Sequence, residues 1–429
     1  MQRALSRREF LRRSSFAGVA LGAVGPAALT RASSSPNEKV IIAVIGCHGR
    51  GMDHIAAYLN VPAAEIGYIC DVDKRALQHG VAAVAAKQQR RPEGFTDLRR
   101  LLEQKDLDAV SIATPDHWHA PAAILACAAG KHVYVEKPGS HNLHESRLLV
   151  AAARKHRRVV QMGNQRRSWP WVQEAIAALH AGELGELFFA RTWYTNHRPS
   201  IGHGRVVPVP PWLDWSLWQG PAPEEPFRDN LPHYNWHWFW TWGTGELGNN
   251  GVHALDVARW GLRVDIPRRV TCGGNRYHFQ DDWQTPDTCV ATFDFGNKGI
   301  VWEGQSCDPR GFEGATFGIN FYGEHGTMSI AGTTARVFDL DQKLVREIKG
   351  RADDVLHFAN FVDAIRRGIP LRAEIEDAEH STRLCHLGNI SWRTGDTLDC
   401  DPVSGDILHD KAARALERRR YRHGWEPKV

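Results

Sequence analysis

The 429-residue chain lacks a membrane-spanning hydrophobic run and the cysteine spacing of metal or disulfide sites. Beyond residues 1–36 it has no hydrophobic run long enough to span a bilayer, so we expect a soluble mature protein. Its eight cysteines follow no Cys-x-x-Cys spacing and have no histidines in register, so they predict neither a metal site nor a disulfide framework. We expect them to be small, buried apolar residues.

The chain also lacks a strong net charge once its N-terminal segment is set aside. The formal charge of the whole chain is +4, but residues 1–36 contribute six basic side chains and one acidic one, so residues 37–429 carry −1. A near-neutral chain gives no electrostatic footprint for nucleic acid or anionic lipid. The basic run LERRRYRH, in a C-terminal tail of residues 403–429, is typical of a solvated helix face rather than of a binding arm.

The N-terminal segment has the three-part layout of an export signal. Arg7 and Arg8 lie in a basic leader, the apolar stretch FAGVALGAVGPAAL follows, and the small polar run TRASSSPNE comes next. The paired arginines, with Ser6 before them and Phe10–Leu11 after them, resemble a twin-arginine signal. We therefore expect residues 1–36 to be a signal peptide and linker, the twin-arginine export machinery to be a partner, and the mature protein to be periplasmic or otherwise exported.

Residues 37–160 alternate strand-like and helix-like segments in the order of βαβ units. The first run, VIIAVIG, is apolar and β-branched, as a strand buried on both faces should be. There follow the helical pattern RGMDHIAAYLN, a second strand AEIGYICDVD, a helix from Lys74 to about Gln89, and the segments DAVSIATP, APAAILACAAG and HVYVEKP. This series predicts an α/β fold with a doubly wound parallel sheet of the Rossmann type.

A glycine-rich turn joins the first predicted strand to its helix. It contains Gly46, His48, Gly49, Arg50 and Gly51, and its backbone amides and helix N-terminus can hold a pyrophosphate. The turn departs from the G-x-G-x-x-G pattern because His48 occupies the middle glycine position. We expect this side chain to change how the backbone approaches the phosphates.

Two strand ends in this sheet carry charged residues. Asp71 ends the second strand, where a carboxylate accepts hydrogen bonds from the adenine ribose of a dinucleotide. Because a carboxylate there repels a 2′-phosphate, NAD is predicted rather than NADP. Glu136 and Lys137 end a later strand at the edge where ligands of open α/β sheets bind, which favours a functional lysine over a solvated one.

The glycine turn, Asp71, the segment ATPDHWHAPAAILACAAGKHVYVEKP and the later GNNGVHALD together resemble the Gfo/Idh/MocA family of oxidoreductases, from about Lys39 to Pro402. The resemblance implies a Rossmann domain, residues 37–160, followed by an α+β domain, residues 161–402, built on a large, open, mostly antiparallel sheet. That second domain would bind the substrate and cover the nicotinamide, and its sheet would make the contacts of a homo-oligomer.

The resemblance also implies roles for individual residues. Lys137 would contact the cofactor ribose and take the proton of the reacting hydroxyl, and His253 would be the active-site histidine that assists it. Asp256 lies one helical turn after His253 on the same face, so we expect both Asp256 and Asn249 to face the substrate. Many relatives have an aspartate four residues before this histidine; here Asn249 stands there, and an amide orients a hydroxyl but cannot share a proton. The family's nicotinamide-ribose loop and its Glu-Lys-Pro motif match Thr114, Pro115, Asp116, His119, Glu136 and Lys137.

A long stretch rich in proline, glycine and aromatic residues precedes the His253 helix. A structureless loop of that length would be unusual, so we expect it to cover a site or a subunit contact. Two interpretations stay open: the wall of a sugar site, in which rings stack on C–H faces and polar groups read hydroxyls, or packing in the core and at an interface. The sugar-site interpretation uses His233, Tyr234 and His237. An extended chain would place four alternating tryptophans on one face: Trp236, Trp238, Trp240 and Trp242.

The remaining segments predict the rest of the second domain. DTCVATFDF, KGIVWEGQS and FGINFYGEHGTMSI are typical of sheet strands, and DDVLHFANFVDAIRRG and EHSTRLCHLGNISWRTG are typical of helices that close the domain. We expect His357, His380 and His386 to be packing or surface residues.

Three functions are compatible with these observations. The first is an exported oxidoreductase that acts on a CH–OH group of a sugar or polyol by hydride transfer with NAD. The second is a redox-neutral glycoside hydrolase or lyase similar to the NAD-dependent α-N-acetylgalactosaminidases, which oxidise a sugar carbon transiently, eliminate the aglycone, add water and reduce the carbon again. The third is a non-catalytic NAD-binding protein, against which Lys137 and His253 argue.

Lys137 favours the first function over the second, because those glycosidase relatives replace the lysine of the Glu-Lys-Pro motif. The export signal adds an expectation about the cofactor. No free NAD pool exists outside the cytoplasm, so the dinucleotide would be held tightly and regenerated in place.

Overall fold

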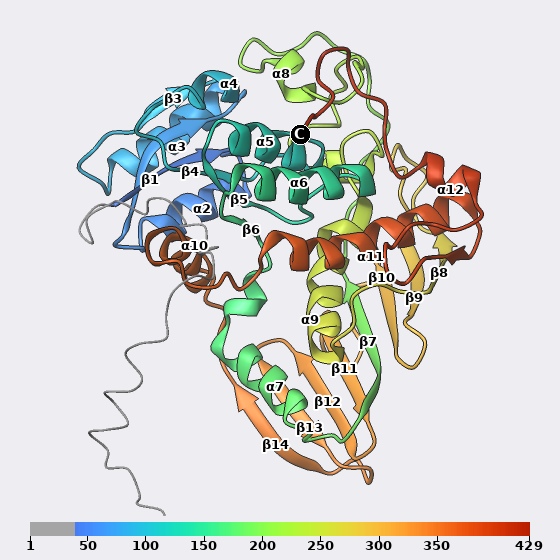
Figure 1. The fold of residues 1–429 in the computed structure, drawn as a ribbon. Coiled ribbons are helices and arrows are strands. Elements are labelled where there is room, and N and C mark those ends of the chain that lie inside the picture. The colour runs from blue at the N-terminus through green and yellow to red at the C-terminus, as the bar shows by residue number, and fades with distance from the viewer. Residues whose placement is uncertain (1–38) are drawn as a thin grey trace, which may run out of the picture.

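The computed structural model describes residues 39–429, so the predicted export signal lies outside the described part of the chain. Two sheets organise this part: a six-stranded parallel sheet and a nine-stranded, mostly antiparallel sheet (Figure 1). This confirms the predicted fold class, a Rossmann domain followed by an α+β domain. Within residues 39–429 no helix is both long enough and apolar enough to cross a membrane.

The parallel sheet has the strand order β3-β2-β1-β4-β5-β6. The apolar strand β1 is almost completely buried, as a central strand covered on both faces should be. The order reverses between β1 and β4, and ligands of open α/β sheets bind at such a switch point. The strands are β1 (Val40–Ile45), β2 (Ala64–Cys70), β3 (Glu93–Phe95), β4 (Ala109–Ile112), β5 (His132–Val135) and β6 (Val160–Met162), with helices α2 (Arg50–Tyr58), α3 (Lys74–Ala85), α4 (Leu98–Leu101), α5 (Asp116–Ala128) and α6 (Leu143–His156).

The second sheet has the order β14-β13-β12-β11-β7-β10-β9-β8-β15, and only its β7–β10 pair is parallel. One face of β9 and β10 is buried and the other is open, because buried and more exposed residues alternate along both strands. The strands are β7 (Leu187–Thr195), β8 (Arg269–Asn275), β9 (Thr288–Asp294), β10 (Gly299–Gln305), β11 (Phe317–Gly323), β12 (Gly326–Ala331), β13 (Thr334–Phe338), β14 (Leu344–Lys349) and β15 (Leu398–Asp399).

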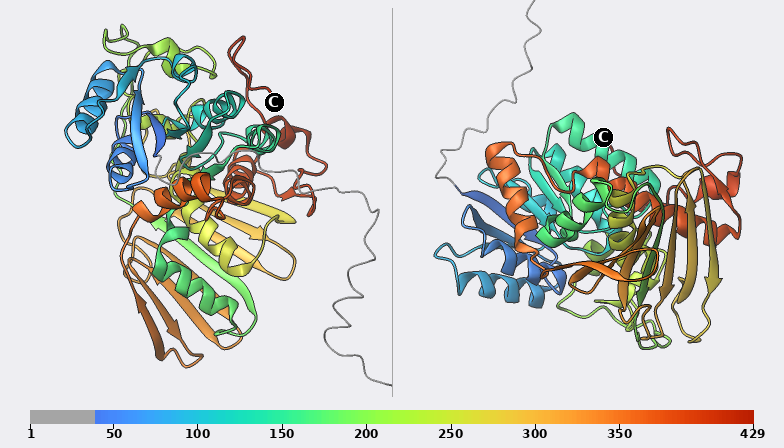
Figure 2. Two further views of the ribbon diagram at one scale, coloured as in Figure 1. Left: turned by 60° about the vertical axis from the view of Figure 1, so that its left-hand side comes forward. Right: turned by 90° about the horizontal axis from the view of Figure 1, so that it is seen from below.

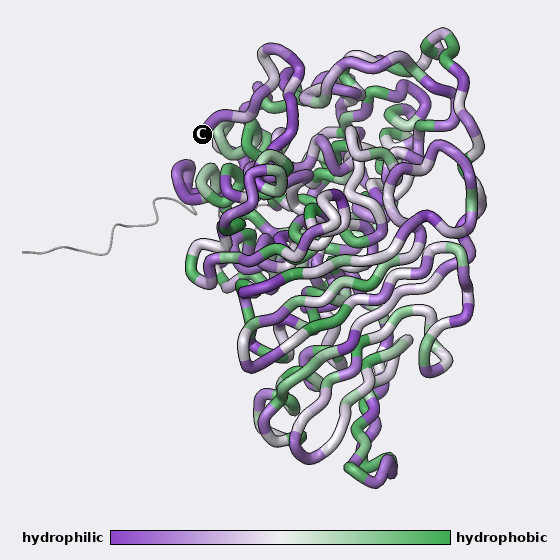
Figure 3. The backbone as a smooth tube through the Cα atoms, turned by 90° about the vertical axis from the view of Figure 1, so that its right-hand side faces the viewer, coloured by the Kyte–Doolittle hydropathy of each residue, from purple (hydrophilic) through white to green (hydrophobic). Residues whose placement is uncertain are grey.

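Three helices cover the buried face of this sheet: α7 (Pro170–His180) packs on β13 and β14, α9 (Val252–Leu262) on β7 and β11, and α11 (Ile375–Thr394) on β8 (Figure 2). On the opposite face the strands cross the view with no helix in front of them (Figure 3). The short elements η1 (Gln165–Ser168) and α12 (Lys411–Ala415) follow β6 and β15.

Helix α10 (Val355–Arg367) was predicted to close the second domain, but it packs on the first. Phe358, Phe361 and Val362 form its apolar face, and they join the core cluster that contains Val40 and Ile42 of β1. The chain therefore returns to the Rossmann sheet after β14, and α11 then crosses back toward the second sheet.

Residues 196–246 form a long excursion between β7 and α9. It contains α8 (Trp215–Gln219) and η2 (Asn235–Trp238), and a π-helical turn, η3 (Leu247–Gly251), leads from it into α9. We call it the aromatic insertion, because it has a small core of its own in which most of the large side chains are aromatic. That core consists of Leu213, Trp215, Trp218, Ala222, Phe227, Leu231, Trp236, Phe239 and Trp242.

The prediction that four alternating tryptophans share one face is wrong. Trp236 and Trp238 lie in η2, a 3₁₀-helix with three residues per turn, so side chains two apart point in different directions. The Trp238 ring stacks on Trp283 with centroids 3.9 Å apart, whereas Trp242 lies in the insertion's own core and Trp240 packs near Trp392.

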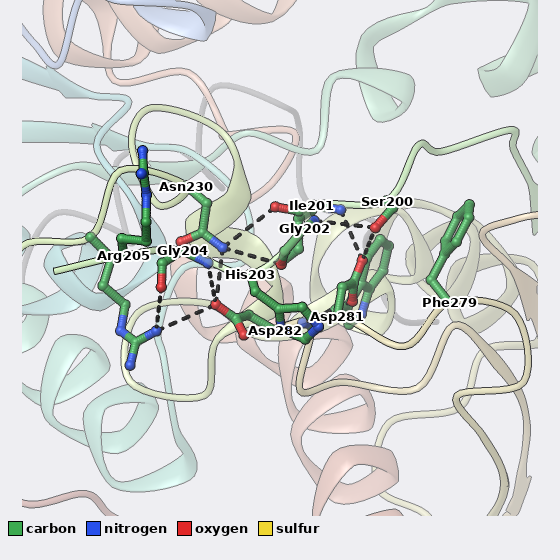
Figure 4. Close-up of polar contacts among 12 residues, drawn as sticks. Ser200, Ile201, Gly202, His203, Gly204, Arg205, Asn230, Phe279, Asp281 and Asp282 are labelled. Atoms are coloured by element: carbon green, nitrogen blue, oxygen red, sulfur yellow. Dashed lines mark hydrogen bonds and ion pairs between the residues drawn. The ribbon is translucent and has the colours of Figure 1, made fainter.

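Two adjacent carboxylates of the second domain anchor the start of the insertion (Figure 4). Asp281 accepts hydrogen bonds from the Ser200 hydroxyl at 2.6 Å and from the Ile201 amide at 2.8 Å. Asp282 accepts from the Gly204 amide at 2.8 Å and from the Asn230 side chain at 3.1 Å. The adjacent residues Asp281 and Asp282 thus hold two separate parts of the insertion, residues 200–204 and Asn230.

The prediction of a solvated helix face over the basic C-terminal run is also wrong. The helix α12 ends at Ala415, before most of the basic residues, and the following segment crosses to the Rossmann domain. Arg419 donates to the buried carboxylate of Glu145 at 2.8 Å and to the carbonyl oxygen of His117 at 2.6 Å. Farther along, the ring of Trp425 packs edge-on against Trp118.

Candidate active site

A pocket of about 510 Å³ opens at the carboxyl edge of the parallel sheet, beneath the aromatic insertion. Its walls come from the turn after β1, the ends of β2, β4 and β5, and the insertion. Of the residues singled out in the sequence, most line it: Gly46, His48, Gly49, Arg50, Asp71, Thr114, Pro115, Asp116, His119, Glu136, Lys137, His233, Tyr234, His237 and Asn249. Gly51, His253 and Asp256 do not line it.

The turn after β1 needs glycine at two positions. Gly46 has φ +85°, and a Cβ on it would lie 2.8 Å from the Ala113 carbonyl oxygen. A Cβ on Gly51 would lie 1.7 Å from the carbonyl oxygen of Gly46, so Gly51 lets the helix pack under the turn rather than touching a ligand. Gly49 precedes α2 without a side-chain cap and faces open space, which leaves backbone amides at the helix N-terminus free for an anion.

The side chain of His48 points out of the turn and toward the insertion. Its ring stacks on His233 with centroids 4.2 Å apart, and His233 Nε2 lies 2.9 Å from the Asp73 carboxylate. Burial lowers the pKa of His233, and the neighbouring His48 lowers it further. The residue that replaces the middle glycine thus ties the phosphate-binding turn to the insertion.

Asp71 is held rigidly at the end of β2. Its Oδ2 accepts from the Cys47 amide at 2.6 Å and its Oδ1 from the Asp73 amide at 2.8 Å. Burial raises the pKa of this carboxyl to about 6, despite these hydrogen bonds. A carboxylate oxygen has more than one acceptor site, so Asp71 can still accept from ribose hydroxyls.

The loop after β4 presents further polar groups to the pocket. The Thr114 hydroxyl is buried without a hydrogen-bond partner among the described residues, as expected of a group that meets a ligand. Pro115 precedes α5, and Asp116, in its first turn, accepts from Thr244 at 2.6 Å. The two ring nitrogens of His119 lie 2.6 Å and 2.7 Å from the carbonyl oxygens of Pro138 and Thr114, which fixes the loop against the end of β5.

Glu136 is the buried centre of a polar cluster. Its Oε1 accepts from Arg50 Nε at 3.0 Å and from Gln165 at 2.8 Å, and it lies 3.0 Å from Nε2 of His54. Burial alone would raise its pKa, but Arg50 and His54 hold the pKa well below its usual range. An ionised Glu136 therefore anchors the strand end from which the next residue, Lys137, extends.

The Lys137 ammonium lies at the pocket end of β5. Its Nζ donates to the backbone carbonyl oxygen of Asn249 at 2.8 Å and to the Asn249 side-chain oxygen at 3.1 Å. Burial lowers the pKa of Lys137, although the carboxylates of Glu136 and Asp116 act in the opposite direction. A lysine in this state loses its proton more readily than a solvated one.

A carboxylate that sequence reasoning missed supports Asn249 from behind. Glu246 is buried, pairs with Arg198 at 2.7 Å and accepts from the Asn249 amide at 3.4 Å. This orients the Asn249 side-chain oxygen toward Lys137. The signal was available, since Glu246 lies three residues before Asn249 and just outside the GNNGVHALD motif.

The two other residues of that motif behave differently. His253 lies next to the pocket but not in its wall; burial lowers its pKa well below the usual range, and the charges of Lys137 and Arg166 add to this. Asp256 was expected to face the substrate, but the structure does not bring it into the pocket. Both of its oxygens are bound by Arg167 at 2.8 Å, in an interior ion pair.

The aromatic insertion forms one wall of the pocket. Trp218, His233, Tyr234, Trp236 and His237 line it, so parts of both interpretations of this segment hold: some rings wall the pocket and others pack in the insertion's core. Burial lowers the pKa of His237 to about 3, so this imidazole is neutral. Tyr234 accepts a hydrogen bond from Arg198 at 2.7 Å, and Arg198 also pairs with Glu246, so Arg198 connects the aromatic insertion to Glu246.

Two family models match this chain. Residues 40–164 match the GFO_IDH_MocA model, described as "Oxidoreductase family, NAD-binding Rossmann fold". Residues 192–427 match the corresponding model described as "Oxidoreductase family, C-terminal alpha/beta domain". The predicted cofactor, NAD, is thereby confirmed for the first domain.

Curated relatives share part of the chain. A "Glycosyl hydrolase family 109 protein" from Saccharopolyspora erythraea is 30% identical over 224 residues, which are 44% of this chain and 49% of the relative. An "Alpha-N-acetylgalactosaminidase" from Shewanella oneidensis is 29% identical over 167 residues, 37% of this chain and 36% of the relative. The chain thus spans about half the length of the first relative and about a third of the second.

Among solved structures, the WlbA dehydrogenase from Bordetella pertussis, in complex with NADH and UDP-GlcNAcA, is similar with a TM-score of 0.67 and 20% sequence identity. The match covers 85% of this chain and 99% of that one. At this identity the likeness supports the fold, and it agrees with the two-domain arrangement in Figure 1.

Proposed function

We propose that this chain, which belongs to the Gfo/Idh/MocA oxidoreductase family, oxidises a hydroxyl group of a sugar or polyol with NAD bound in the pocket. One observation carries the proposal: Lys137, at the end of β5, extends into the pocket with its pKa lowered by burial and its ammonium held by Asn249. Such a lysine suits proton transfer from a hydroxyl.

Other residues of the pocket fit a dinucleotide independently of Lys137. Gly46 permits the tight turn against Ala113, Gly49 leaves open space for phosphates at the N-terminus of α2, and Asp71 supplies the ribose acceptor. The unpartnered Thr114 hydroxyl would meet the nicotinamide end. When bound there, NAD supplies the acceptor for the hydride that leaves the oxidised carbon.

The protein's contribution is to position the hydroxyl and remove its proton. Lys137 takes the proton, and the paired Arg198–Glu246 unit behind Asn249 keeps the lysine directed at the pocket. The aromatic insertion excludes water with Trp218 and Trp236. The neutral His237 donates its Nδ1 proton to the Tyr234 carbonyl oxygen at 2.6 Å, so its Nε2 can accept a hydrogen bond from a sugar hydroxyl.

The contact between the phosphate turn and the aromatic insertion also favours a captive cofactor. We propose that the protein is exported with NAD already bound, since the twin-arginine pattern around Arg7 and Arg8 resembles the signal of proteins exported after folding. The stacked pair His48–His233 joins the phosphate-binding turn to the aromatic insertion, which would slow the dissociation of NAD.

A second candidate is a redox-neutral glycosidase, and the curated relatives favour it: they are named glycosyl hydrolase family 109 proteins, one of them an α-N-acetylgalactosaminidase. Both candidates begin with the same oxidation of a sugar hydroxyl, so both need bound NAD, whereas the presence of Lys137 favours the oxidoreductase. They differ in whether a bond to an aglycone is then broken.

Incubating the purified protein, without added dinucleotide, with a panel of free sugars and glycosides tests the proposal. An oxidoreductase should form one equivalent of keto sugar and bound NADH, and further turnover should need an added carbonyl acceptor. Sustained cleavage of glycosides without any acceptor, with solvent deuterium entering the carbon beside the transient ketone, would establish the glycosidase instead.

A further inference from the structure

The pocket extends past Asp71 toward the β3 edge of the parallel sheet. The residues that line this end come from the segment after β3, from α5 and from α8: Thr96, Asp97, Leu98, Trp118, Leu217 and Trp218. In a Rossmann fold the pyrophosphate lies at the turn after the first strand, and the acid at the end of the second strand binds the adenosine ribose. The adenine ring is therefore expected beyond Asp71, where leucine and tryptophan side chains can contact its apolar faces.

Helix α8 and the residues just before it connect the two sides of this end of the pocket. On one side, the Asp214 amide donates to the carbonyl oxygen of Val72, at the end of β2, at 3.0 Å. On the other side, Nε1 of Trp118 donates to the carbonyl oxygen of Trp218 at 3.0 Å, and Nε2 of His117 lies 2.9 Å from the same oxygen. A helix of five residues is not stable on its own, so the position of α8 depends on tertiary contacts such as these.

The C-terminal segment, residues 416–429, lies beside α8 and contacts it (Figure 1). The guanidinium of Arg422 donates to the carbonyl oxygen of Ser216 at 3.1 Å and to its hydroxyl oxygen at 3.0 Å. The Arg422 amide donates to the carbonyl oxygen of Pro221 at 3.1 Å, and the guanidinium pairs with Glu224 at 2.6 Å. One residue thus holds both α8 and the loop after it, although it does not line the pocket.

The same segment is attached to the Rossmann domain at two further points. Arg419 donates to the buried carboxylate of Glu145, in α6, at 2.8 Å. The ring of Trp425 packs edge-on against Trp118 with centroids 5.5 Å apart, and the guanidinium carbon of Arg99, in α4, lies 4.8 Å from the centroid of the Trp425 ring. The segment therefore ties α8 to three helices of the Rossmann domain, and a movement of α8 away from α5 has to break some of these contacts.

We propose that the adenosine end of NAD is held between the end of β2 and α8, against Leu98, Trp118 and Trp218, and that the C-terminal segment controls its release by holding α8 in place. This rests on the proposed function, to which it adds the part of the chain that makes the cofactor captive. Dissociation of the dinucleotide then requires α8 to move, which breaks the contacts of Arg422 and Trp425.

The rate at which bound NAD exchanges tests this without requiring turnover. The purified full-length protein, loaded with NAD, is mixed with an excess of deuterium-labelled NAD. At increasing times the protein is separated by rapid gel filtration, and the unlabelled dinucleotide that it still holds is measured by mass spectrometry.

The variant that combines Arg422→Gln with Trp425→Ala should release NAD about 10- to 100-fold faster than the wild type, because charge-assisted hydrogen bonds and an aromatic contact are lost. It keeps the Arg419 anchor, so the segment stays attached to α6. Arg422→Gln alone is the milder variant should the double variant not fold, and it should accelerate release at least about threefold. Arg418→Gln is the matched control, since it breaks only an exposed pair within the same segment, and its release rate should equal that of the wild type.

ADP-ribose shows which end of the dinucleotide the segment holds, because it has the adenosine and the pyrophosphate but no nicotinamide. Its release, measured in the same way with labelled ADP-ribose, should be accelerated in the Arg422 variants by the same factor as that of NAD. Faster release of NAD alone would assign the effect to the nicotinamide end and overturn the inference.

The outcomes separate this inference from the proposed function. Release of NAD at the same rate from the wild type and from the Arg422 variants would overturn the role of the C-terminal segment, even in a protein that oxidises sugars. Retention of NAD that depends on Arg422, in a protein that oxidises no sugar, would overturn the proposed function and leave the role of the segment standing.

Discussion

At the scale of single residues, the contact between Lys137 and Asn249 determines the chemistry that the pocket can perform. Lys137→Ala should lower turnover by about 10²- to 10⁴-fold, the usual contribution of a general base. NAD should stay bound, because the phosphate turn and Asp71 lie elsewhere in the pocket. Steady-state kinetics and the cofactor content of the variant check this; full activity would show that another group takes the proton.

The negative charge of Glu246 should raise the pKa of Lys137. Glu246→Gln should therefore lower that pKa and shift the acid limb of the activity profile toward lower pH. Arg198, left without its partner, would push in the same direction. The matched control is Glu303→Gln, which breaks the Arg191–Glu303 pair on the second sheet and should leave the profile unchanged. An unshifted profile in Glu246→Gln would contradict the link to Lys137.

Asp71 should make cofactor binding depend on pH. Burial raises its pKa to about 6, so in the free protein the carboxyl is protonated below that pH and ionised above it. The ionised form is the better acceptor for ribose hydroxyls, so NAD affinity should rise as the pH increases through about 6 and fall below it. Binding measured from pH 5 to 8 checks the sign; Asp71→Asn should remove this step and weaken binding at every pH.

The residues found from the sequence are those whose role follows from local motifs. The glycine turn, Asp71 and the Glu136–Lys137 pair lie at strand ends that the βαβ order fixes, and the structure brings them to one pocket. Asp256 could not be placed this way, because its partner Arg167 comes from a segment 89 residues away.

At the scale of elements, the aromatic insertion and the C-terminal segment were harder to predict than the sheets. Periodicity predicts a strand or helix, but the insertion consists of short turns whose directions depend on tertiary contacts such as the Trp238–Trp283 stack. The charged sequence of the C-terminal segment predicts a solvated segment. Its Arg419 and Tyr421 nevertheless donate hydrogen bonds to the buried Glu145. A charged run is therefore a poor guide to exposure when it can pair with a distant carboxylate.

The attachment of the C-terminal segment should contribute to stability. Arg419→Gln leaves Glu145, which is completely buried, without its cationic partner and should lower the free energy of unfolding by about 3–5 kcal/mol. Arg418→Gln is the control, since it breaks only an exposed pair with Glu426 and should change stability by less than about 1 kcal/mol. Urea denaturation measures both; equal effects of the two changes would show that the segment is not anchored through Glu145.

At the scale of the whole molecule, the two domains and the insertion together line one pocket. The Rossmann sheet supplies the phosphate turn and Lys137, η3 supplies Asn249, and the insertion supplies Trp218, Trp236 and His237. Helices α10 and α11 connect the domains a second time, after β14. The predicted homo-oligomer, which would use the bare face of the nine-stranded sheet in Figure 3, stays a prediction.

The central claim is that the protein retains NAD in this pocket as a tightly bound group and oxidises a sugar with it. Mass spectrometry of the small molecules released on denaturing the purified, extensively dialysed protein tests it most directly. We predict NAD or NADH in an amount close to that of the protein, and conversion of the released NAD to NADH after brief exposure to the sugar substrate. An empty pocket, with activity appearing only when millimolar NAD is added, would contradict the claim.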